Sequence, residues 1–354
     1  MKKLFTPYSK AALQLKNHVV MAPMTRSRAI GNVPNNLMAI YYKQRSGAGL
    51  IITEGTSPSP EGLGYPRIPG IFTDAQVEGW KLVTNAVHKG GSKIFVQLMH
   101  TGRIAHSSNL PEGYHVVGLS AVKATGEIYT DTGMFEYSAP TALDDKGIAR
   151  IIEDHVKAAK NAIAAGFDGV ELHGAHGYLL EQSLNPHINN RTDNYGGTIE
   201  KRTRLTLEIV QKIAASIGAD KVGLRISPFL ISNDMSAYEE AEVHETYILL
   251  AREVNQLSIA YLHISNNPGI PEKTHQGIRG AFSNTIIYCN GFTAETAEAK
   301  IQDGSADLVA FGRSFLANPD FMRRIEKNAP LNEPDYNTLY TPGEEGYTDY
   351  PTLD

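Results

Sequence analysis

Eight short apolar segments recur along this chain, each followed by a polar, Gly-rich or Pro-rich stretch. They read HVVMAP from His18, AGLIITEG from Ala48, SKIFVQLMH from Ser92, FDGVELHG from Phe167, DKVGLRISP from Asp220, IAYLHIS from Ile259, NTIIYCNG from Asn284 and SADLVAFG from Ser305. Their continuous apolar character, in place of an alternating one, is typical of parallel strands that are covered on both faces. The sequence therefore predicts eight buried parallel strands.

The segments between these strands have helical patterns. The first begins at Thr73, a typical N-cap residue, and closes at a pair of glycines. Four further segments have the same form: 143–166, 199–218, 241–257 and 293–304. Eight strand-then-helix units predict the α/β fold class and a (β/α)8 TIM barrel, with an open doubly wound sheet as the alternative. Because no low-complexity linker divides the chain, we expect a single domain over residues 1–354.

Two segments depart from a minimal barrel. The stretch 101–143, after the third strand, is too long for a simple connection, and we expect it to hold an inserted hairpin or lid over one mouth of the barrel. The tail that begins YNTLYTPGEEGYTDYP at Tyr336 has no core-forming period but is rich in aromatic residues. We expect this tail to pack back onto the body.

Composition excludes several classes of protein. The formal net charge of −5 and the scattered basic residues disfavour nucleic-acid binding, which needs clustered Lys and Arg. Cys289 is the only cysteine, so neither an intrachain disulfide nor a Cys-rich metal site can form. No export signal and no run of eighteen apolar residues is present, so we expect a cytoplasmic protein without a membrane segment.

Polar residues at the ends of the strands carry the functional argument, because the active site of a (β/α)8 barrel lies at the C-terminal ends of its strands. Gln97 and Arg225 occur inside strands fit for burial, where an unpaired amide or guanidinium is costly. An internal hydrogen bond or salt bridge would satisfy either residue taken singly. Together, on neighbouring strands, they predict the floor of a polar ligand site.

The last two units place small turns directly after apolar strands. These turns contain Asn290 and Gly291 in one case and Gly312 and Arg313 in the other. Loops in these positions of a barrel commonly bind a phosphate, to which an arginine adds a charged contact. A plain turn with a solvated arginine is the alternative. No G-x-G-x-x-G or Walker fingerprint occurs, so a Rossmann domain is not supported.

The stretch VELHGAHGYLLEQSLNPHINNRTDNYGG follows the fourth strand and places His173, His176 and Tyr178 within six positions. Residues three apart on a regular strand face opposite ways, so the two imidazoles share a target only if the backbone leaves the extended state. Gly174 and Gly177 permit that change, and a first helical turn would bring both rings to one side. A metal-dependent hydrolase using the two histidines is an alternative, but no convincing carboxylate set accompanies them and we expect no metal.

These motifs, together with MAPMTRSR, VQLMHTGR, RISP, NGFTAETAE, AFGRSFLANPD and EGYTDYP, resemble the old yellow enzyme family of flavin-dependent ene-reductases from near Leu4 to Pro351. The resemblance implies a barrel that holds noncovalent FMN, with NADPH or NADH as reductant. It also implies ping-pong reduction of the activated C=C bond of small α,β-unsaturated carbonyl or nitro compounds. In this family the nicotinamide and the alkene use the same place in turn, which explains the missing Rossmann motif.

Carried over by position, the resemblance implies roles for individual residues. His173 and His176 would bind the activating oxygen of the substrate, Tyr178 would protonate the α-carbon, and Tyr65 and Tyr340 would be walls of the substrate pocket. The cofactor would be held by Pro23, Met24, Thr25, Gly55, Gln97, Arg225, Asn290, Gly291, Gly312 and Arg313, the last four at its phosphate.

Two positions qualify the resemblance. Thr25 stands where some relatives carry Cys, which places the chain nearer the Thr-bearing branch. Met99 stands where many relatives have Trp, and a flexible thioether shapes a pocket differently from an indole, so substrate range does not transfer. We expect a monomer or a homodimer, and a protein that retains FMN without turnover is the third alternative.

Overall fold

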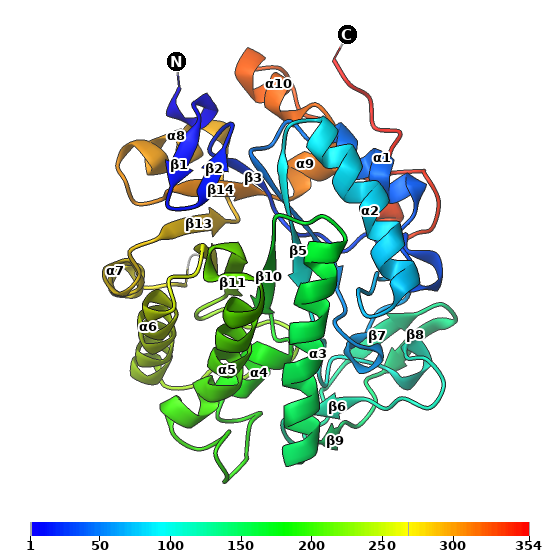
Figure 1. Ribbon diagram of the computed structural model, residues 1–354, viewed down its shortest axis with the longest axis vertical. Coiled ribbons are helices and arrows are strands. Elements are labelled where there is room, and N and C mark those ends of the chain that lie inside the picture. Colours follow the sequence, from blue (N-terminus) through cyan, green and yellow to red (C-terminus); the bar gives the residue numbers. More distant parts are fainter. Residues whose placement is uncertain (1, 268, 354) are drawn as a thin grey trace.

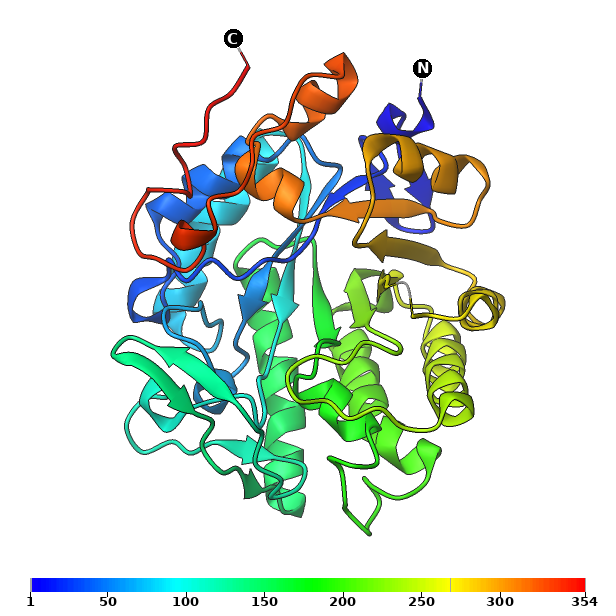
Figure 2. The same cartoon turned by 180° about the vertical axis from the view of Figure 1, so that it is seen from behind.

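The computed structural model describes residues 2–267 and 269–353, and its centre is a closed barrel of parallel strands (Figures 1 and 2). The barrel strands, in order around the ring, are β3 (Val19–Met21), β4 (Leu50–Thr56), β5 (Lys93–Leu98), β10 (Gly169–Gly174), β11 (Val222–Ile226), β12 (Tyr261–Ser265), β13 (Thr285–Cys289) and β14 (Leu308–Phe311). Pairing of β14 with β3 closes the ring. Each of the eight predicted segments contains one strand, so the barrel is confirmed and the open sheet is wrong.

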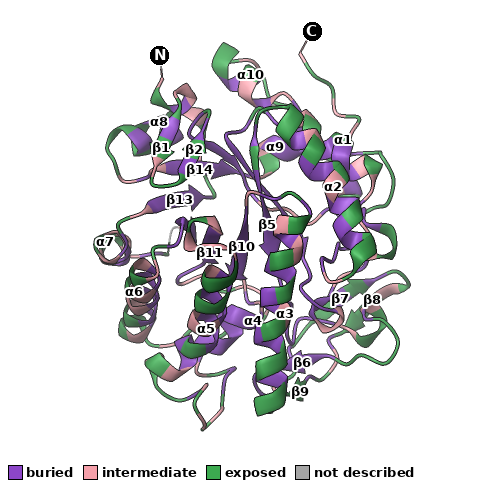
Figure 3. Cartoon of the chain, viewed as in Figure 1, coloured by how far each residue is buried: buried purple, intermediate pink, exposed green. Residues whose placement is uncertain are grey.

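Helices surround the barrel; the longer ones bury one face and expose the other, whereas α4 (Leu179–Leu184) is buried along its whole length (Figure 3). They are α1 (Asn36–Gln44), α2 (Asp74–Lys89), α3 (Asp145–Ala164), α4 (Leu179–Leu184), α5 (Ile199–Ile217), α6 (Glu240–Gln256), α7 (Glu272–Ala281), α8 (Ala294–Gln302), α9 (Arg313–Ala317) and α10 (Phe321–Lys327). As predicted, Thr73 caps α2, and it does so in a capping box with Gln76. Within residues 2–267 and 269–353, no helix is long and apolar enough to cross a membrane.

Short 3-10 helices lie in the connections. They are η1 (Lys3–Phe5), η2 (Ile30–Asn32), η3 (Pro60–Gly62), η4 (Ser107–Asn109), η5 (Ala219–Lys221) and η6 (Tyr336–Thr338).

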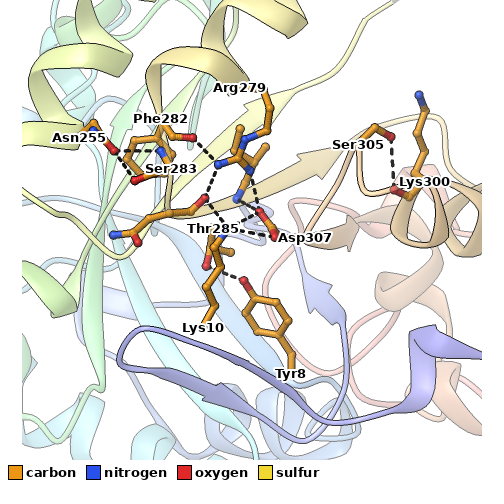
Figure 4. Close-up of polar contacts among 12 residues, drawn as sticks. Tyr8, Lys10, Asn255, Arg279, Phe282, Ser283, Thr285, Lys300, Ser305 and Asp307 are labelled. Carbon is orange, nitrogen blue, oxygen red and sulfur yellow. Dashed lines mark hydrogen bonds and ion pairs between the residues drawn. The ribbon is translucent and has the colours of Figure 1, made fainter.

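An antiparallel hairpin that the sequence did not predict covers the N-terminal end of the barrel. It consists of β1 (Tyr8–Lys10) and β2 (Leu13–Leu15). The Tyr8 hydroxyl lies 2.7 Å from Thr285 Oγ1, and Lys10 Nζ lies 3.2 Å from Asp307 Oδ1, which ties the hairpin to the starts of β13 and β14 (Figure 4). Its apolar side chains join a cluster inside the barrel, which includes Leu50, Phe95 and Tyr261. This end of the barrel is therefore filled with side chains.

The segment between β5 and α3 forms the predicted insertion. The strands β7 (Glu127–Thr130) and β8 (Gly133–Glu136) pair as an antiparallel hairpin, and β6 (Val117–Gly118) pairs in parallel with β9 (Thr141–Ala142). Figure 1 shows the insertion at the lower right, far from the N-terminal hairpin at the upper left. The expected hairpin after the third barrel strand is confirmed.

The C-terminal tail packs on the body, as expected. Tyr347 is fully buried and stacks on Tyr41 with ring centroids 4.1 Å apart. Arg26 Nη2 donates a 2.6 Å hydrogen bond to the carbonyl of Gly346, and the Arg28 guanidinium lies 4.8 Å from the centre of the Tyr347 ring. Two buried arginines after β3 thus fix the tail beside the C-terminal end of the barrel.

Candidate active site

A cavity of about 450 Å³ lies at the C-terminal ends of the barrel strands. This volume is within the usual range of small-molecule and cofactor sites, roughly 300–1,000 Å³. The residues predicted to hold a cofactor all line it, as do the two histidines and the tyrosine after β10: Pro23, Met24, Thr25, Gly55, Gln97, His173, His176, Tyr178, Arg225, Asn290, Gly291, Gly312 and Arg313. The closed barrel therefore brings together strand ends that are far apart in the chain.

The floor of the cavity carries a buried polar network. Gln97 Nε2 donates to Glu171 Oε1 at 2.8 Å, and His263 Nδ1 lies 2.8 Å from Glu171 Oε2. Burial alone would lower the pKa of His263, but the Glu171 carboxylate raises it. Gln97 thus has the internal hydrogen bond expected of a buried amide and also faces the cavity.

Arg225 lies beside this network with an unsatisfied donor. Its Nη2 is 3.7 Å from Cys289 Sγ, whereas its buried Nε has no hydrogen-bond partner among the described residues. An unpaired buried donor on a charged group is costly unless a ligand accepts from it. The floor therefore offers a positive charge and a free N–H to a ligand.

Small residues shape the walls of the cavity. A Cβ at Gly55 would lie 2.5 Å from Met99 Sδ, so a larger residue there would move the thioether from its place in this wall. At the mouth, Asn290 and Gly291 have φ of 82° and 77°, which turns the backbone out of β13. Arg313 is exposed there, and its Nη1 donates to the Tyr336 hydroxyl at 3.4 Å. The predicted phosphate-binding residues thus lie together at the mouth.

The turn after β10 brings the two imidazoles together. The ring centroids of His173 and His176 are 5.3 Å apart, with an angle of 81° between the planes. The expected convergence is confirmed, but its expected cause is partly wrong. Gly174 remains in the strand, and a tight turn with φ of 57° at His176 and 78° at Gly177 replaces the expected helical turn.

Both histidines are neutral near pH 7. Burial lowers the pKa of His173 and of His176 well below the ordinary value, and the nearby Arg225 lowers both further. His173 Nδ1 is buried without a hydrogen-bond partner in the described chain. His176 Nε2 lies 2.8 Å from Ser265 Oγ, a contact that sequence reasoning missed although Ser265 ends a predicted strand. A neutral imidazole keeps one N–H, so each ring can donate a hydrogen bond.

Tyr178 lies beside the histidines and carries a protonated phenol. Its ring centroid is 5.0 Å from that of His173, and its hydroxyl is 3.0 Å from the hydroxyl of Tyr65. Burial raises the pKa of both tyrosines. Tyr65, Tyr178, Thr25 and the exposed Tyr340 line a second cavity of about 320 Å³. Thr25 and Tyr178 line both cavities. Tyr65 and Tyr340, the two tyrosines predicted as walls of the substrate pocket, therefore lie next to the 450 Å³ cavity.

Comparison with known proteins agrees with this arrangement. Residues 3–332 match the model of the NADH:flavin oxidoreductase / NADH oxidase family. The chain is 42% identical to 12-oxophytodienoate reductase 1 of Oryza sativa subsp. japonica over 360 residues, which covers 99% of this chain and 93% of the rice protein.

Solved structures show the same similarity. Morphinone reductase superposes with a TM-score of 0.94 at 44% identity, covering 99% of this chain and 96% of that one. Morphinone reductase in complex with tetrahydroNAD gives 0.95 at 44% identity, covering 99% and 98%. An old yellow enzyme homologue from Zymomonas mobilis gives 0.94 at 40% identity, covering 99% of both chains.

Proposed function

Because this chain belongs to the NADH:flavin oxidoreductase / NADH oxidase family, the old yellow enzyme family, we propose that its 450 Å³ cavity holds FMN beneath an alkene site made by His173, His176 and Tyr178. The protein is an oxidoreductase that takes hydride from NAD(P)H and reduces the activated C=C bond of small molecules. This membership excludes the metal-dependent hydrolase considered from the sequence.

The residues of the cavity fit FMN. The unpaired Nε of Arg225 and the positive floor suit the polar edge of a flavin ring, and Gly55 adds no side chain to the cavity that such a ring would enter. Thr25 would donate a hydrogen bond to a ring carbonyl, and Gln97 would bind the ring from its free carbonyl end. Pro23 and Met24 would pack beside it. FMN, when bound, supplies the hydride that it has received from the nicotinamide.

The phosphate of the cofactor would lie at the mouth of the cavity. There Arg313 offers a charged fork. Asn290, Gly291 and Gly312 also line the cavity, and the backbone N–H groups of their turns would bind the anion.

His173 and His176 would bind the oxygen that activates the alkene. Hydride addition to the β-carbon moves negative charge onto that oxygen, and a well-placed donor there is worth about 3 kcal/mol. Two neutral imidazoles 5.3 Å apart provide such donors without taking a proton from solvent. This pair of neutral donors, His173 buried and His176 half-buried at the cavity, is the observation that carries the assignment of the alkene site.

Tyr178 would complete the reduction by giving its phenolic proton to the α-carbon. Its hydroxyl is protonated at neutral pH, and the Tyr65 hydroxyl at 3.0 Å can pass on a replacement proton. Tyr65 and Tyr340 would form the wall against the remainder of the substrate. In this arrangement the nicotinamide and the alkene occupy one place in turn, which makes the kinetics ping-pong.

The domain organisation, oligomeric state and location of the protein are also part of the proposal. We infer one domain over 1–354, a monomer or homodimer, and a cytoplasmic enzyme, in agreement with a single buried cysteine and a chain without clustered basic residues.

Separate assays of the two half-reactions test the proposal. Protein loaded with FMN is mixed with NADPH or NADH, and the loss of flavin absorbance is followed; 2-cyclohexenone or a nitroalkene is then added. Bleaching by a nicotinamide and recovery with the alkene is the expected result. A yellow protein that shows neither step would be a flavin-binding protein without turnover and would overturn the proposal.

A further inference from the structure

The turn that carries His176 has an unfavourable backbone conformation. Its φ of 57° lies in the left-handed region, which costs free energy in a residue other than glycine unless the surroundings fix it. Gly177 follows with φ of 78°, so two consecutive residues are left-handed. The position of the His176 imidazole therefore depends on the contacts that hold this turn.

One buried carboxylate holds the turn at both residues. Glu181, in the first turn of α4, is 2% exposed, and its Oε2 accepts a 2.6 Å hydrogen bond from the Gly177 N–H. Its Oε1 accepts a 2.5 Å bond from Ser227 Oγ, and Ser227 Oγ in turn accepts a 2.8 Å bond from the His176 N–H. Tyr247, on α6, donates to the same Oε1 at 2.8 Å.

We propose that the ionised carboxylate of Glu181 is a positioning residue that holds the His176–Gly177 turn and thereby sets the His176 imidazole beside His173. The inference rests on the proposed function, because it assigns its importance to the binding of an oxygen by that imidazole. The carboxylate accepts from all three donors at once, and each of these bonds is charge-assisted. The amide of glutamine is neutral: its oxygen can accept from the Gly177 N–H, but its two N–H groups then need the Ser227 and Tyr247 hydroxyls as acceptors, so the charge-assisted bonds are lost.

The surroundings of Glu181 make this support sensitive to pH. Burial raises the pKa of Glu181 to about 7, although Ser227, the Gly177 N–H and the Tyr247 hydroxyl lower it. These three donors face the Glu181 carboxylate. The more distant Tyr238 hydroxyl also faces it, and burial together with the Glu181 charge raises the pKa of Tyr238. A cavity of about 210 Å³, lined by Glu181 with mainly apolar side chains, lies on its other side.

The direction of the pH effect follows from these contacts. Above pH 7 the carboxylate is ionised and accepts three hydrogen bonds. Below pH 7 the carboxyl group is neutral, one of the two hydroxyls must turn to accept its proton, and the bonds that hold the turn are no longer charge-assisted. Burial lowers the pKa of His173 and His176 and raises that of Tyr178. The pKa of His263, at the cavity floor, is raised by Glu171, and its charge also acts on both histidines, so a shift of the midpoint in Tyr247→Phe is what assigns that midpoint to Glu181.

The test measures binding of a phenol to the FMN-loaded enzyme by the change in flavin absorbance, from about pH 6 to pH 8.5. The probe is 4-methoxyphenol, whose own pKa lies near that of tyrosine, about 10. For the unaltered enzyme, we expect the affinity to fall about tenfold at the acidic end with a midpoint near the pKa of Glu181, since the bonds to Glu181 lose their charge assistance.

Three variants separate positioning from simple loss of structure. Glu181→Gln should bind the phenol at every pH about as weakly as the unaltered enzyme does at the acidic end, without a midpoint, because its amide is neutral throughout. Tyr247→Phe removes a donor that lowers the pKa of Glu181, so its midpoint should move to higher pH. Tyr238→Phe is the matched control, because it removes a hydroxyl from the same cavity without removing a bond to Glu181, and its midpoint should stay near that of the unaltered enzyme.

The outcomes distinguish this inference from the proposed function. If Glu181→Gln binds like the unaltered enzyme, or if affinity shows no midpoint while the enzyme still reduces 2-cyclohexenone, the inference is wrong and the function stands. If the unaltered enzyme neither binds the phenol nor reduces the enone at any pH, the function itself fails. Should Glu181→Gln not fold, an unmoved midpoint in Tyr247→Phe would overturn the inference.

Discussion

Replacing Tyr178 with phenylalanine removes one hydroxyl and keeps the ring. The ring contacts with His173 and Tyr65, at centroid distances of 5.0 and 6.3 Å, can therefore persist. The structural cost is the hydrogen bonds of the hydroxyl, to the Tyr65 hydroxyl and to the Asn233 side chain, a net loss of about 0.5–1.5 kcal/mol each. Folding and FMN content should thus be nearly unchanged.

The kinetic consequence should be confined to one half of the reaction. A positioned general acid contributes roughly 10²–10⁴-fold to the rate of its step. Proton delivery to the α-carbon belongs to reduction of the alkene, whereas hydride transfer from the nicotinamide needs no proton from Tyr178. We expect Tyr178→Phe to slow reoxidation by 2-cyclohexenone by about 10²–10⁴-fold and to leave reduction by NADPH within about twofold.

Stopped-flow absorbance of the flavin measures both halves in the same protein. Tyr65→Phe is the matched control, because it removes the partner hydroxyl but leaves the proton on Tyr178. Its reoxidation should be slowed much less than that of Tyr178→Phe. Equal slowing of both halves by Tyr178→Phe, or reoxidation at the normal rate, would refute the assignment of Tyr178 as the proton donor.

Three further predictions address the oxygen site, the cavity and the tail. His173→Ala should weaken phenol binding about 10- to 100-fold in absorbance titrations while FMN content stays constant, and an unchanged titration would remove His173 from the oxygen site. Cys289 lies buried at the cavity wall, and although burial raises the pKa of its thiol, His263 and Arg225 lower it overall. It should react with N-ethylmaleimide in FMN-free protein and be protected by FMN. Because it is the only cysteine, intact mass gives zero or one adduct, and equal labelling with and without FMN would place the cofactor elsewhere. Tyr347→Ala should cost about 3–5 kcal/mol in denaturant unfolding, whereas the exposed Tyr336→Ala should cost little, and equal costs would contradict the anchoring role of the stacked tail.

The sequence predicted the barrel well because each strand is a continuous apolar run. Such a run can be identified from the local sequence alone, without knowledge of the distant residues that it contacts. The N-terminal hairpin was missed because its strands, Tyr8–Lys10 and Leu13–Leu15, are too short to show a period. Its burial depends on contacts with residues such as Thr285 that lie far along the chain.

The sequence also predicted part of the candidate site. The residues that it missed are those whose role depends on contacts between distant parts of the chain. The residues at strand ends could be named because a closed barrel must bring them to one mouth. Glu181 and Ser227 were not singled out, since a glutamate at the start of a helix and a serine before a proline carry no local signal of their shared hydrogen bond. The turn at His176 was assigned to Gly174 and Gly177 because glycine is the usual left-handed residue, but hydrogen bonds from outside the turn fix His176 in that conformation instead.

The most direct test of the account is a crystal structure of the FMN-loaded protein with 4-methoxyphenol bound. We expect the flavin ring in the cavity beside Thr25, Gln97 and Arg225, with the phenol oxygen within hydrogen-bond distance of both His173 and His176. A flavin outside this cavity, or a phenol oxygen that contacts neither imidazole, would contradict it.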